Sequence, residues 1–510
     1  MKKRIYNSGS NSRYISRLGT VFARLHSRLQ RWASLVILTI LLVVASRLPA
    51  AAAGALHYTD LEYKPLPEIQ LPEYERYQLN NGMVVYLVED HELPLVSGTA
   101  IIRTGDRLEP DEKIGLASLV GEVMRTGGTS KHSGEELNQL LEQKAATVET
   151  AISLTSGSAS FNSLSEDLEQ VFDLFAEVIQ EPVFAQDKLE LAKNQKAGQI
   201  ARRNDDPKDI AGREFQKLIY GEKSPYARTE EYETLKSISR ADLVAFYEQY
   251  FHPKNMILGI VGDFDPTQMR SRIQEKFGNW KSASSVSELT VPSAAQARKE
   301  GIFLIDQPQL TQSYIQMGHL GGKLDNPDYA ALAVLNEILN GFGGRLFNEV
   351  RARQGLAYSV YGVWSARYDF PGLFLAGGQT RSEATVPFIQ AMLSEINKIS
   401  TTPVKIDELA RAKEGVSNSF VFNFEKPSQT LSRLMRYEYY GYPEDFIFRY
   451  LQGVEATTIK DIQRVAKKYL QPDQIVTLVV GNAKTIEPPL TSLTSEVTSL
   501  DITIPEPTNS

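Results

Sequence analysis

The chain has 510 residues, contains no cysteine and carries a formal net charge of −7. Without cysteine it can form neither disulfides nor thiolate chemistry. The acidic balance argues against nucleic acid as a partner, because phosphate binding needs a basic face. A chain of this length can bury more than one hydrophobic core.

The first 56 residues have the organisation of a secretory signal. Nine basic residues and no acidic residue precede Asp60, an apolar run occupies residues 33–46, and small residues follow Pro49. This is the order of a basic region, an apolar region and a cleavage site. A retained membrane anchor is the alternative. Arg47 interrupts the apolar stretch, and the run is shorter than the ~20 residues of a membrane span. Both interpretations predict export to the periplasm or cell envelope.

A long internal repeat follows. Residues 238–263 align without a gap on residues 457–482, and each copy contains an amphipathic helix, a Pro-marked turn and an apolar strand closed by Gly262 or Gly481. Two further pairs occur in the same order, 115–126 with 330–341 and 182–193 with 403–413. An offset near 220 residues is the length of a whole domain. The sequence therefore predicts two copies of one fold, with the groove between them as the first candidate site.

Amino-acid composition divides the rest of the chain into five segments. A body without the nine N-terminal basic residues has a net charge of −16, which suits solubility and is compatible with basic peptides. We expect a surface arm, a first domain, a Ser/Ala-rich linker that lets the domains face each other and hinge, a second domain, and a Pro/Thr/Ser-rich tail predicted to be disordered. Their bounds are 57–76, 77–280, 281–300, 301–484 and 485–510.

Each domain is predicted to be α+β, with helices packed on one face of a mainly antiparallel sheet. The apolar runs 83–88 and 95–102, after Asn81-Gly82, suggest a hairpin of buried strands. Helical stripes of apolar residues follow in both halves. They are Leu168, Val171, Phe172, Phe175, Val178 and Ile179 in the first half, and Val386, Ile389, Leu393 and Ile396 in the second.

Several short motifs occur in order along both halves: Leu79-Asn-Asn-Gly82, Gly115-Leu-Ala117, Leu164-Ser-Glu-Asp167, Asp205-Asp-Pro207, Ser224-Pro-Tyr226, Gly262-Asp263 and the long stretch Gly343-Gly-Arg-Leu-Phe347-Asn-Glu-Val-Arg351-Ala-Arg-Gln-Gly-Leu-Ala-Tyr358. Together they resemble the pitrilysin family of zinc peptidases, which includes insulin-degrading enzyme and the mitochondrial processing peptidase. The resemblance covers residues 77–484 and implies the family's clamshell of two homologous domains.

The resemblance also implies where zinc would bind. In the family, an H-x-x-E-H helix supplies two histidine ligands and the general base, and a downstream Glu is the third ligand. Here Ser118 and Glu122 occupy the histidine positions and Gly121 the base position. Residues 193–200 hold no carboxylate, and no two of the six histidines are four residues apart. We therefore expect no metal and no cofactor in this chain.

Glu122 is the one potential ligand left on that helix. A carboxylate there could act as a ligand or an acid, but it is more simply explained as solvated or paired with Arg125.

The second half keeps the other part of the family's active site. By resemblance, Arg351 and Tyr358 match the Arg and Tyr that reach a bound peptide, where a guanidinium and a phenol can stabilise a developing oxyanion. Alone, they would be ordinary surface and core residues; the surrounding motif favours the functional role. Gly343 and Gly344 could contact substrate, although glycines beside a helix end are commonly caps.

The family also adds peptides to an edge strand of the first domain. The matching stretch is residues 147–154, where Glu149 and Thr150 stand in place of the usual Asn-Ala. Backbone pairing can survive this change, but the departure puts strand binding in doubt.

Together these features predict the non-zinc, peptide-binding subunit of an exported heterodimeric metalloendopeptidase, with zinc in a homologous H-x-x-E-H partner. The alternative is a non-enzymatic scaffold or peptide-binding protein with the same fold. A self-sufficient peptidase of another mechanism has no nucleophile–base constellation to support it.

Overall fold

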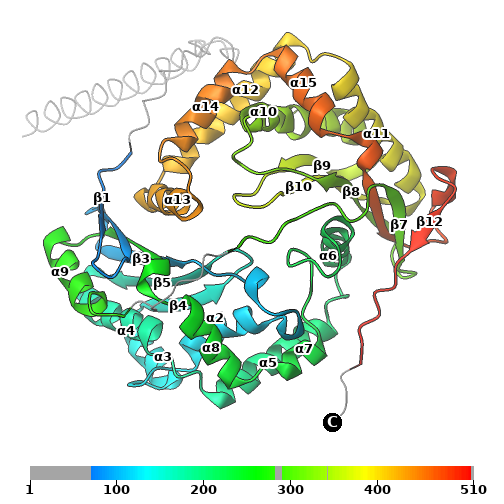
Figure 1. Cartoon of the computed structure of the whole chain (residues 1–510). Coiled ribbons are helices and arrows are strands. Elements are labelled where there is room, and N and C mark those ends of the chain that lie inside the picture. Colours follow the sequence, from blue (N-terminus) through cyan, green and yellow to red (C-terminus); the bar gives the residue numbers. More distant parts are fainter. Residues whose placement is uncertain (1–70, 282–289, 342, 507–510) are drawn as a thin grey trace, which may run out of the picture. The chain divides into compact units, whose positions relative to one another are not determined.

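The computed structural model describes residues 71–281, 290–341 and 343–506. These residues form two six-stranded sheets, each with its own helices (Figure 1). The prediction of two homologous α+β domains is confirmed. The proposed signal or anchor and residues 282–289 of the linker lie outside the described residues.

Five of the six strands have the same order in both sheets, and the outermost strands differ. The first runs β1 (Glu75–Gln78), β2 (Val84–Glu89), β6 (Met256–Gly262), β3 (Leu95–Ile102), β5 (Gly157–Leu164) and β4 (Thr147–Ile152). The second runs β12 (Val497–Ser499), β7 (Gly301–Asp306), β11 (Val476–Gly481), β8 (Gln312–Leu320), β10 (Leu373–Arg381) and β9 (Ala357–Ser365). β2 pairs in parallel with β6 as β7 does with β11, and antiparallel pairs predominate. The outermost β1 is antiparallel to β2, whereas β12, the last strand, is parallel to β7.

Within the described residues, the first half contains eight α-helices and the second half six. The first half supplies α2 (Leu116–Thr126), α3 (Gly134–Gln143), α4 (Leu168–Gln180), α5 (Gln186–Ala201), α6 (Pro207–Tyr220), α7 (Tyr232–Ser237), α8 (Arg240–Tyr250) and α9 (Pro266–Phe277). The second supplies α10 (Tyr329–Asn340), α11 (Thr385–Thr401), α12 (Ile406–Phe420), α13 (Pro427–Tyr440), α14 (Phe446–Ala456) and α15 (Ile459–Tyr469). Residues 347–353 form a π-helix, η6 (Phe347–Arg353).

Local capping explains why the repeat is so clear between α8 and α15. Ser239 and Asp242 form a capping box at the start of α8, and Thr458 and Asp461 form the matching box at the start of α15. Each box satisfies backbone N–H groups that the first helical turn leaves unpaired. Both helices then lead into the central strand of their sheet, β6 or β11.

The predicted hairpin of residues 83–88 and 95–102 is wrong. Both segments are strands, β2 and β3, but β6 lies between them and pairs with each. β6 is buried along its whole length. A strand buried on both faces gains more from the centre of a sheet than from its edge, and its position could not be inferred from the adjacent segments alone.

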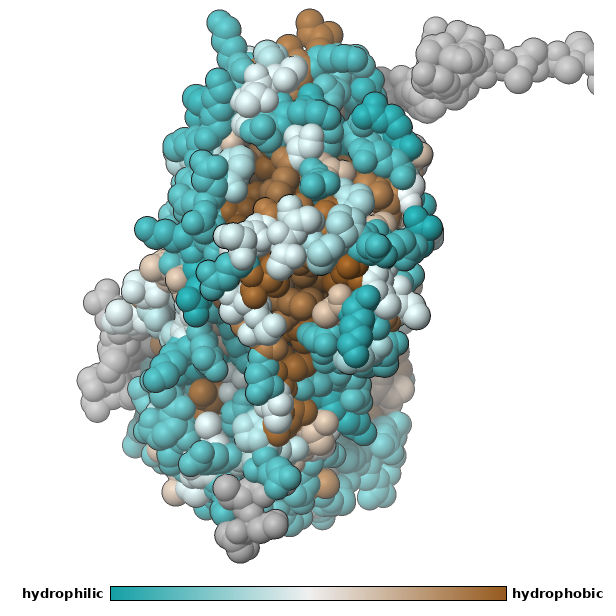
Figure 2. All heavy atoms as spheres, turned by 90° about the vertical axis from the view of Figure 1, so that its right-hand side faces the viewer, coloured by the Kyte–Doolittle hydropathy of each residue, from teal (hydrophilic) through white to brown (hydrophobic). Residues whose placement is uncertain are grey.

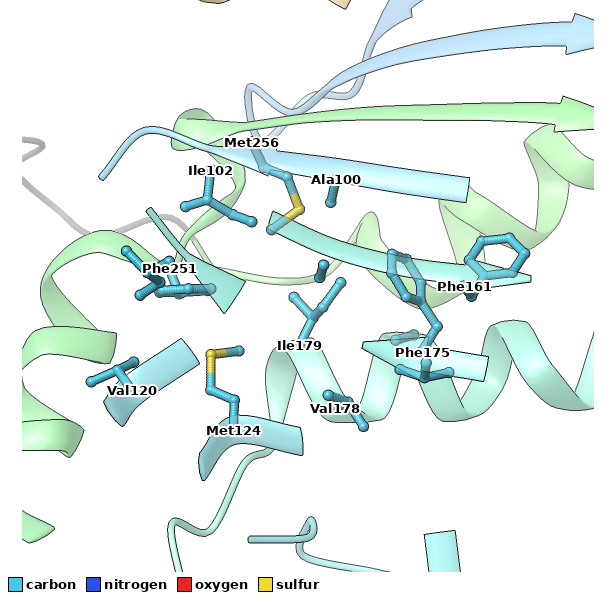
Figure 3. Packing of buried hydrophobic residues seen from close by; sticks show 14 of the residues in the cluster. Ala100, Ile102, Val120, Met124, Phe161, Phe175, Val178, Ile179, Phe251 and Met256 are labelled. Atoms are coloured by element: carbon cyan, nitrogen blue, oxygen red, sulfur yellow. The ribbon is translucent and has the colours of Figure 1, made fainter. Parts of the chain in front are cut away.

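The main core of each half lies between its sheet and its helices. Figure 3 shows the first: Val120 and Met124 of α2 lie near Ile179 of α4 and Met256 of β6. Both predicted apolar stripes belong to these cores, with Leu168 and Leu393 at their margins. Their identity as core residues is confirmed.

The second face of each sheet is covered by a helix from the other half. Leu431 and Met435 of α13 pack on Tyr86 and Ile257 of the first sheet. Reciprocally, α6 packs on the second sheet through a cluster of Ile210, Ala211, Phe215, Leu218 and Ile219 with Phe303, Ile305, Val476, Leu478 and Val480. The halves therefore exchange one helix each and share apolar cores.

This exchange predicts that the halves remain associated when the linker is cut. With a protease site inserted at residues 282–289, the two fragments should co-elute at the size of the intact chain after cleavage. The reason is that separation would expose the apolar faces of α6 and α13, at about 25 cal/mol for each Å². Separation of the fragments in native buffer would contradict shared cores.

The prediction of a disordered tail is wrong for residues 485–506. Ile486 and Leu490 are buried in the second core, and β12 pairs in parallel with β7. Leu500 and Ile502 pack beside the α6 cluster. Figure 2, which shows the right-hand side of Figure 1, has an apolar band between hydrophilic flanks. Regularly spaced apolar residues outweigh the Pro/Thr/Ser composition because each of them buries surface against a preformed sheet.

Among the described residues, no helix has the length and apolar character needed to cross a bilayer.

Candidate functional site

The helix that would carry zinc in the family is α2, and its ligand positions do not fit a metal. The Ser118 hydroxyl donates to Oε1 of Glu230 (2.9 Å), and Nζ of Lys196 lies 2.8 Å from the same oxygen. Lys196 belongs to the stretch of α5 where the third ligand was expected. The ammonium group of Lys196 thus pairs with the carboxylate of Glu230, which contacts Ser118 at the first ligand position.

Gly121, at the position of the general base, has no space for a side chain. A Cβ atom there would lie 2.5 Å from the backbone nitrogen of Ile152 and 2.8 Å from the carbonyl carbon of Ala151. Real Cβ contacts essentially never fall below 3.0 Å. The close approach of α2 to β4 therefore requires glycine and excludes a glutamate base in this backbone arrangement.

Glu122 does not pair with Arg125, so the pairing part of that interpretation is wrong. Arg125 is buried, its Nε donates to the carbonyl of Val148 (2.8 Å), and its other arm donates to Asn138. The Arg125 side chain therefore points to the edge of β4 and not along α2 toward Glu122. Glu122 is partly buried, and its carboxylate accepts no hydrogen bond from any described residue.

The donor set as a whole disagrees with a zinc site. No three His, Cys, Asp or Glu side chains within residues 71–281, 290–341 and 343–506 are grouped to hold a metal ion. Zinc catalysis needs two imidazoles, a base and a further carboxylate; here a hydroxyl and a glutamate stand for the imidazoles, a glycine for the base, and Lys196 lies where the further carboxylate was expected. The part of the chain that the structure describes therefore offers no residues to support zinc chemistry.

The edge of β4 is engaged by α2. In the β4–β5 turn the Ser153 N–H donates to the carbonyl of Ser156 (2.8 Å), so the backbone groups of Ser153 point toward β5. Because successive residues of a strand alternate, the backbone N–H and C=O groups of Ile152, Thr150 and Val148 point away from β5. Of these, Val148 accepts from Arg125 and the Ile152 nitrogen lies against Gly121. Addition of a peptide strand to β4 would first require α2 to move.

The two predicted peptide contacts on β4 differ. The hydroxyl of Thr150 donates to the carbonyl of Gly121 (2.5 Å), which ties the strand to α2. Glu149 is exposed and helps to offset the charge of Arg125, whose pKa is lowered mainly by burial.

The second half shows the same arrangement with different chemistry. By the repeat, Asn336 of α10 corresponds to Gly121, and its amide caps the edge of β9. Asn336 accepts from the Trp364 N–H (2.7 Å) and donates to the Trp364 carbonyl (3.1 Å). Sequence reasoning missed this residue; its place in the repeat is the signal that could have found it.

Arg351 and Tyr358 are brought together, as predicted. Arg351 lies on η6 and Tyr358 on the adjoining β9, with the guanidinium carbon 4.7 Å from the centre of the tyrosine ring. Tyr358 is 83 % exposed, which is extreme for an aromatic residue in a strand. Arg351 forms no ion pair with any described carboxylate. The pair therefore presents free donors at the surface.

The two glycines before η6 have separate roles. Gly343 has φ +80°, is exposed, and has nothing within 4 Å of a Cβ position. Its left-handed backbone favours glycine in this turn. Gly344 is buried, and its N–H donates to Gly341 (2.6 Å) in the turn after α10. Gly343 alone is accessible to a ligand.

A cavity of about 630 Å³ adjoins Ser118. Its lining includes Asp106, Glu109, Arg228 and Glu230 from the first half and Gln316 from β8. Burial raises the pKa of Asp106 from 3.8 to about 6, with the nearby Arg228 opposing that rise. The Asp106 carboxylate has no hydrogen bond from any described residue.

The shift at Asp106 predicts a pH-dependent stability. A carboxyl whose pKa rises on folding favours the folded state below pH 3.8, and this contribution is lost as the pH rises through about 6. Asp106→Asn, which cannot ionise, should therefore gain about 2 kcal/mol relative to wild type between pH 4 and pH 7.5. Urea unfolding of both proteins at the two pH values measures this difference, and an equal gap at both would contradict it.

Two successive segments of the chain match models of the same protein family. Residues 84–224 match the model described as Insulinase (Peptidase family M16). Residues 237–416 match the model described as Peptidase M16 inactive domain.

Two relatives carry contrasting descriptions. The chain is 23 % identical over 409 residues to "Uncharacterized zinc protease YmxG" of Bacillus subtilis, covering 79 % of this chain and 98 % of the relative. It is 23 % identical over 423 residues to "Non-peptidase homolog YmxG" of Helicobacter pylori, covering 82 % and 96 %.

The fold matches a solved structure of the same kind. The structure of a peptidase M16 inactive domain from Pseudomonas fluorescens superimposes with a TM-score of 0.72 at 24 % identity, over 80 % of this chain and 98 % of that one. The matches of both halves agree with the duplicated sheets, and the missing ligands agree with the inactive type. The chain belongs to the peptidase M16 family, as an inactive member that has lost the zinc-binding motif.

Proposed function

We propose that this chain is the non-zinc subunit of an exported, heterodimeric M16 metalloendopeptidase. A homologous partner with H-x-x-E-H would bind zinc and activate water. This chain would bind unstructured peptide and donate to the oxyanion through Arg351 and Tyr358. The observation that carries the proposal is the Arg351–Tyr358 pair, in which the Tyr358 ring is exposed and the partly buried Arg351 guanidinium has no carboxylate partner within the described residues.

The chemistry of the pair suits this role. Negative charge builds on the peptide carbonyl oxygen when water attacks, and preorganised donors lower the barrier. A guanidinium stays charged at every working pH and offers several donors in a fixed plane. Tyr358 adds a phenol next to it. Solubility alone would not explain why Arg351 lies beside an exposed tyrosine.

Export is part of the proposal and rests on the N-terminal sequence alone. The basic stretch, short apolar run and small residues support a cleaved signal, or a retained anchor, and a periplasmic or envelope location.

The second candidate is a scaffold or peptide-binding protein without a role in catalysis. The engaged edge of β4 favours it, because the strand that would hold a peptide in an active first domain is tied to α2. The two candidates differ in whether the chain changes the rate of a zinc-bearing partner.

Titration separates them. The H-x-x-E-H homologue of the same organism is held at fixed concentration, this chain is added, and cleavage of an internally quenched, unstructured peptide is followed. The proposal expects the rate to rise and to saturate at one chain per partner. A stable complex whose rate equals that of the partner alone would favour the scaffold and reject the proposal.

A further inference from the structure

The segment that carries Arg351 is a π-helix. η6 spans Phe347–Arg353, and the N–H of Gln354 donates to the carbonyl of Glu349, five residues back (3.2 Å). π-Helices are rare and occur frequently at functional sites. Phe347 and Arg351 are four residues apart on this helix and face the same side, since the side chains are in contact.

Two aromatic rings from two elements contact the Arg351 guanidinium. Its central carbon lies 4.8 Å from the centre of the Phe347 ring on η6 and 4.7 Å from the centre of the Tyr358 ring on β9. Both distances are within the ~6 Å reach of a cation–π contact. Phe347 is partly buried, whereas Tyr358 is largely exposed. Phe347 is therefore the firmer of the two supports.

The neighbouring arginines are held differently. Arg345 donates to both carboxylate oxygens of Glu408 (2.7 and 3.0 Å), and Arg353 forms an ion pair with Glu349. Both use their N–H donors within the chain. Arg351 is the one of these three arginines without a carboxylate partner among the described residues.

We propose that Phe347 is a positioning residue that orients Arg351 without consuming its donors. A carboxylate would also orient the guanidinium, but it would occupy the N–H groups that a peptide oxyanion needs. An aromatic ring attracts the cation through its π face and leaves N–H groups for a ligand. This inference rests on the proposed function and adds a residue to the same site.

Kinetics of the two-chain complex provide the first test, with the zinc-bearing homologue and the quenched peptide as partners. Phe347→Leu should lower kcat about 10-fold and leave KM within about twofold, because misplaced catalytic groups raise the barrier without weakening ground-state binding. Phe347→Tyr keeps a ring in place and should restore kcat to within about twofold of wild type. Phe422→Leu removes another exposed aromatic of this half and should have no effect.

A spectroscopic readout tests the ring contact in this chain alone. The Nε–Hε resonance of Arg351 is identified by its loss in Arg351→Lys. Two adjacent rings should shift it upfield from the other exposed arginines. The shift should shrink in Phe347→Leu and persist in Phe347→Tyr, which a purely structural loss of packing would not reproduce.

The outcomes distinguish the inference from the function on which it rests. If wild-type chain fails to raise the partner's rate, the proposed function fails and this inference with it. If wild type raises the rate and Phe347→Leu matches wild type in kcat, or leaves the Arg351 resonance unchanged, the inference alone is overturned. Equal loss of kcat in Phe347→Leu and Phe347→Tyr would also overturn it.

Discussion

Arg351→Ala is expected to lower the peptidase rate of the two-chain complex about 100-fold, since removal of one oxyanion donor typically costs 10²–10³ in kcat. Tyr358→Phe, which removes only a hydroxyl, should produce a loss of the same kind. Both side chains lie at the surface and neither has an ion pair, so complex formation and thermal stability should stay unchanged. Steady-state kinetics with a quenched peptide, together with size-exclusion chromatography of the complex, measure both properties.

Arg353→Ala is the matched control for Arg351→Ala. It lies on the same π-helix, and its partner Glu349 is four residues away in an exposed ion pair, a type that contributes about 0.3–0.5 kcal/mol. Its rate should equal that of wild type. If Arg351→Ala and Arg353→Ala have equal effects, or if neither changes the rate of an active complex, Arg351 has no specific role.

The second large effect is expected at Gly121. Gly121→Ala places a Cβ 2.5 Å from the Ile152 nitrogen and should destabilise the fold by about 2 kcal/mol, a typical cost of overpacking. The triple variant Ser118→His, Gly121→Glu and Glu122→His restores the H-x-x-E-H letters. It should bind no stoichiometric zinc, because the glutamate has no space and Lys196 occupies the region of the third ligand.

Gly198→Ala is the control for this substitution. Gly198 lies inside α5 with nothing within 4 Å of its Cβ position, so alanine should stabilise the chain by about 0.5–1 kcal/mol. Urea unfolding compares the two alanine variants, and metal analysis after dialysis examines the triple variant. One tightly held zinc in a fully stable triple variant would contradict the steric account.

Much of the fold could be predicted from the sequence because the duplicated elements repeat their local signals. The capping boxes of α8 and α15 and the apolar strands after them recur at one offset, so each copy supports the other. The exchange of α6 and α13 could not be predicted. An amphipathic helix specifies that it must cover an apolar face, but not which of two similar sheets supplies that face.

Some features of the candidate site could likewise be predicted from the sequence and others could not. The missing zinc ligands at Ser118 and Glu122, the missing base at Gly121 and the pairing of Arg351 with Tyr358 follow from motif positions. The contacts of Lys196 with Glu230, and of Arg125 with β4, join segments far apart in the chain. No local pattern predicts such contacts. Phe347 lay within the motif, four residues before Arg351, and helical spacing was the available signal.

Hydrolysis of one quenched peptide by three preparations tests the central claim most directly: this chain alone, the zinc-bearing homologue alone, and the two combined at equal concentration. The account predicts no turnover by this chain, low turnover by the homologue, and a combined rate far above the sum of the separate rates. Turnover by this chain alone that a zinc chelator abolishes, or a combined rate equal to that sum, would contradict it.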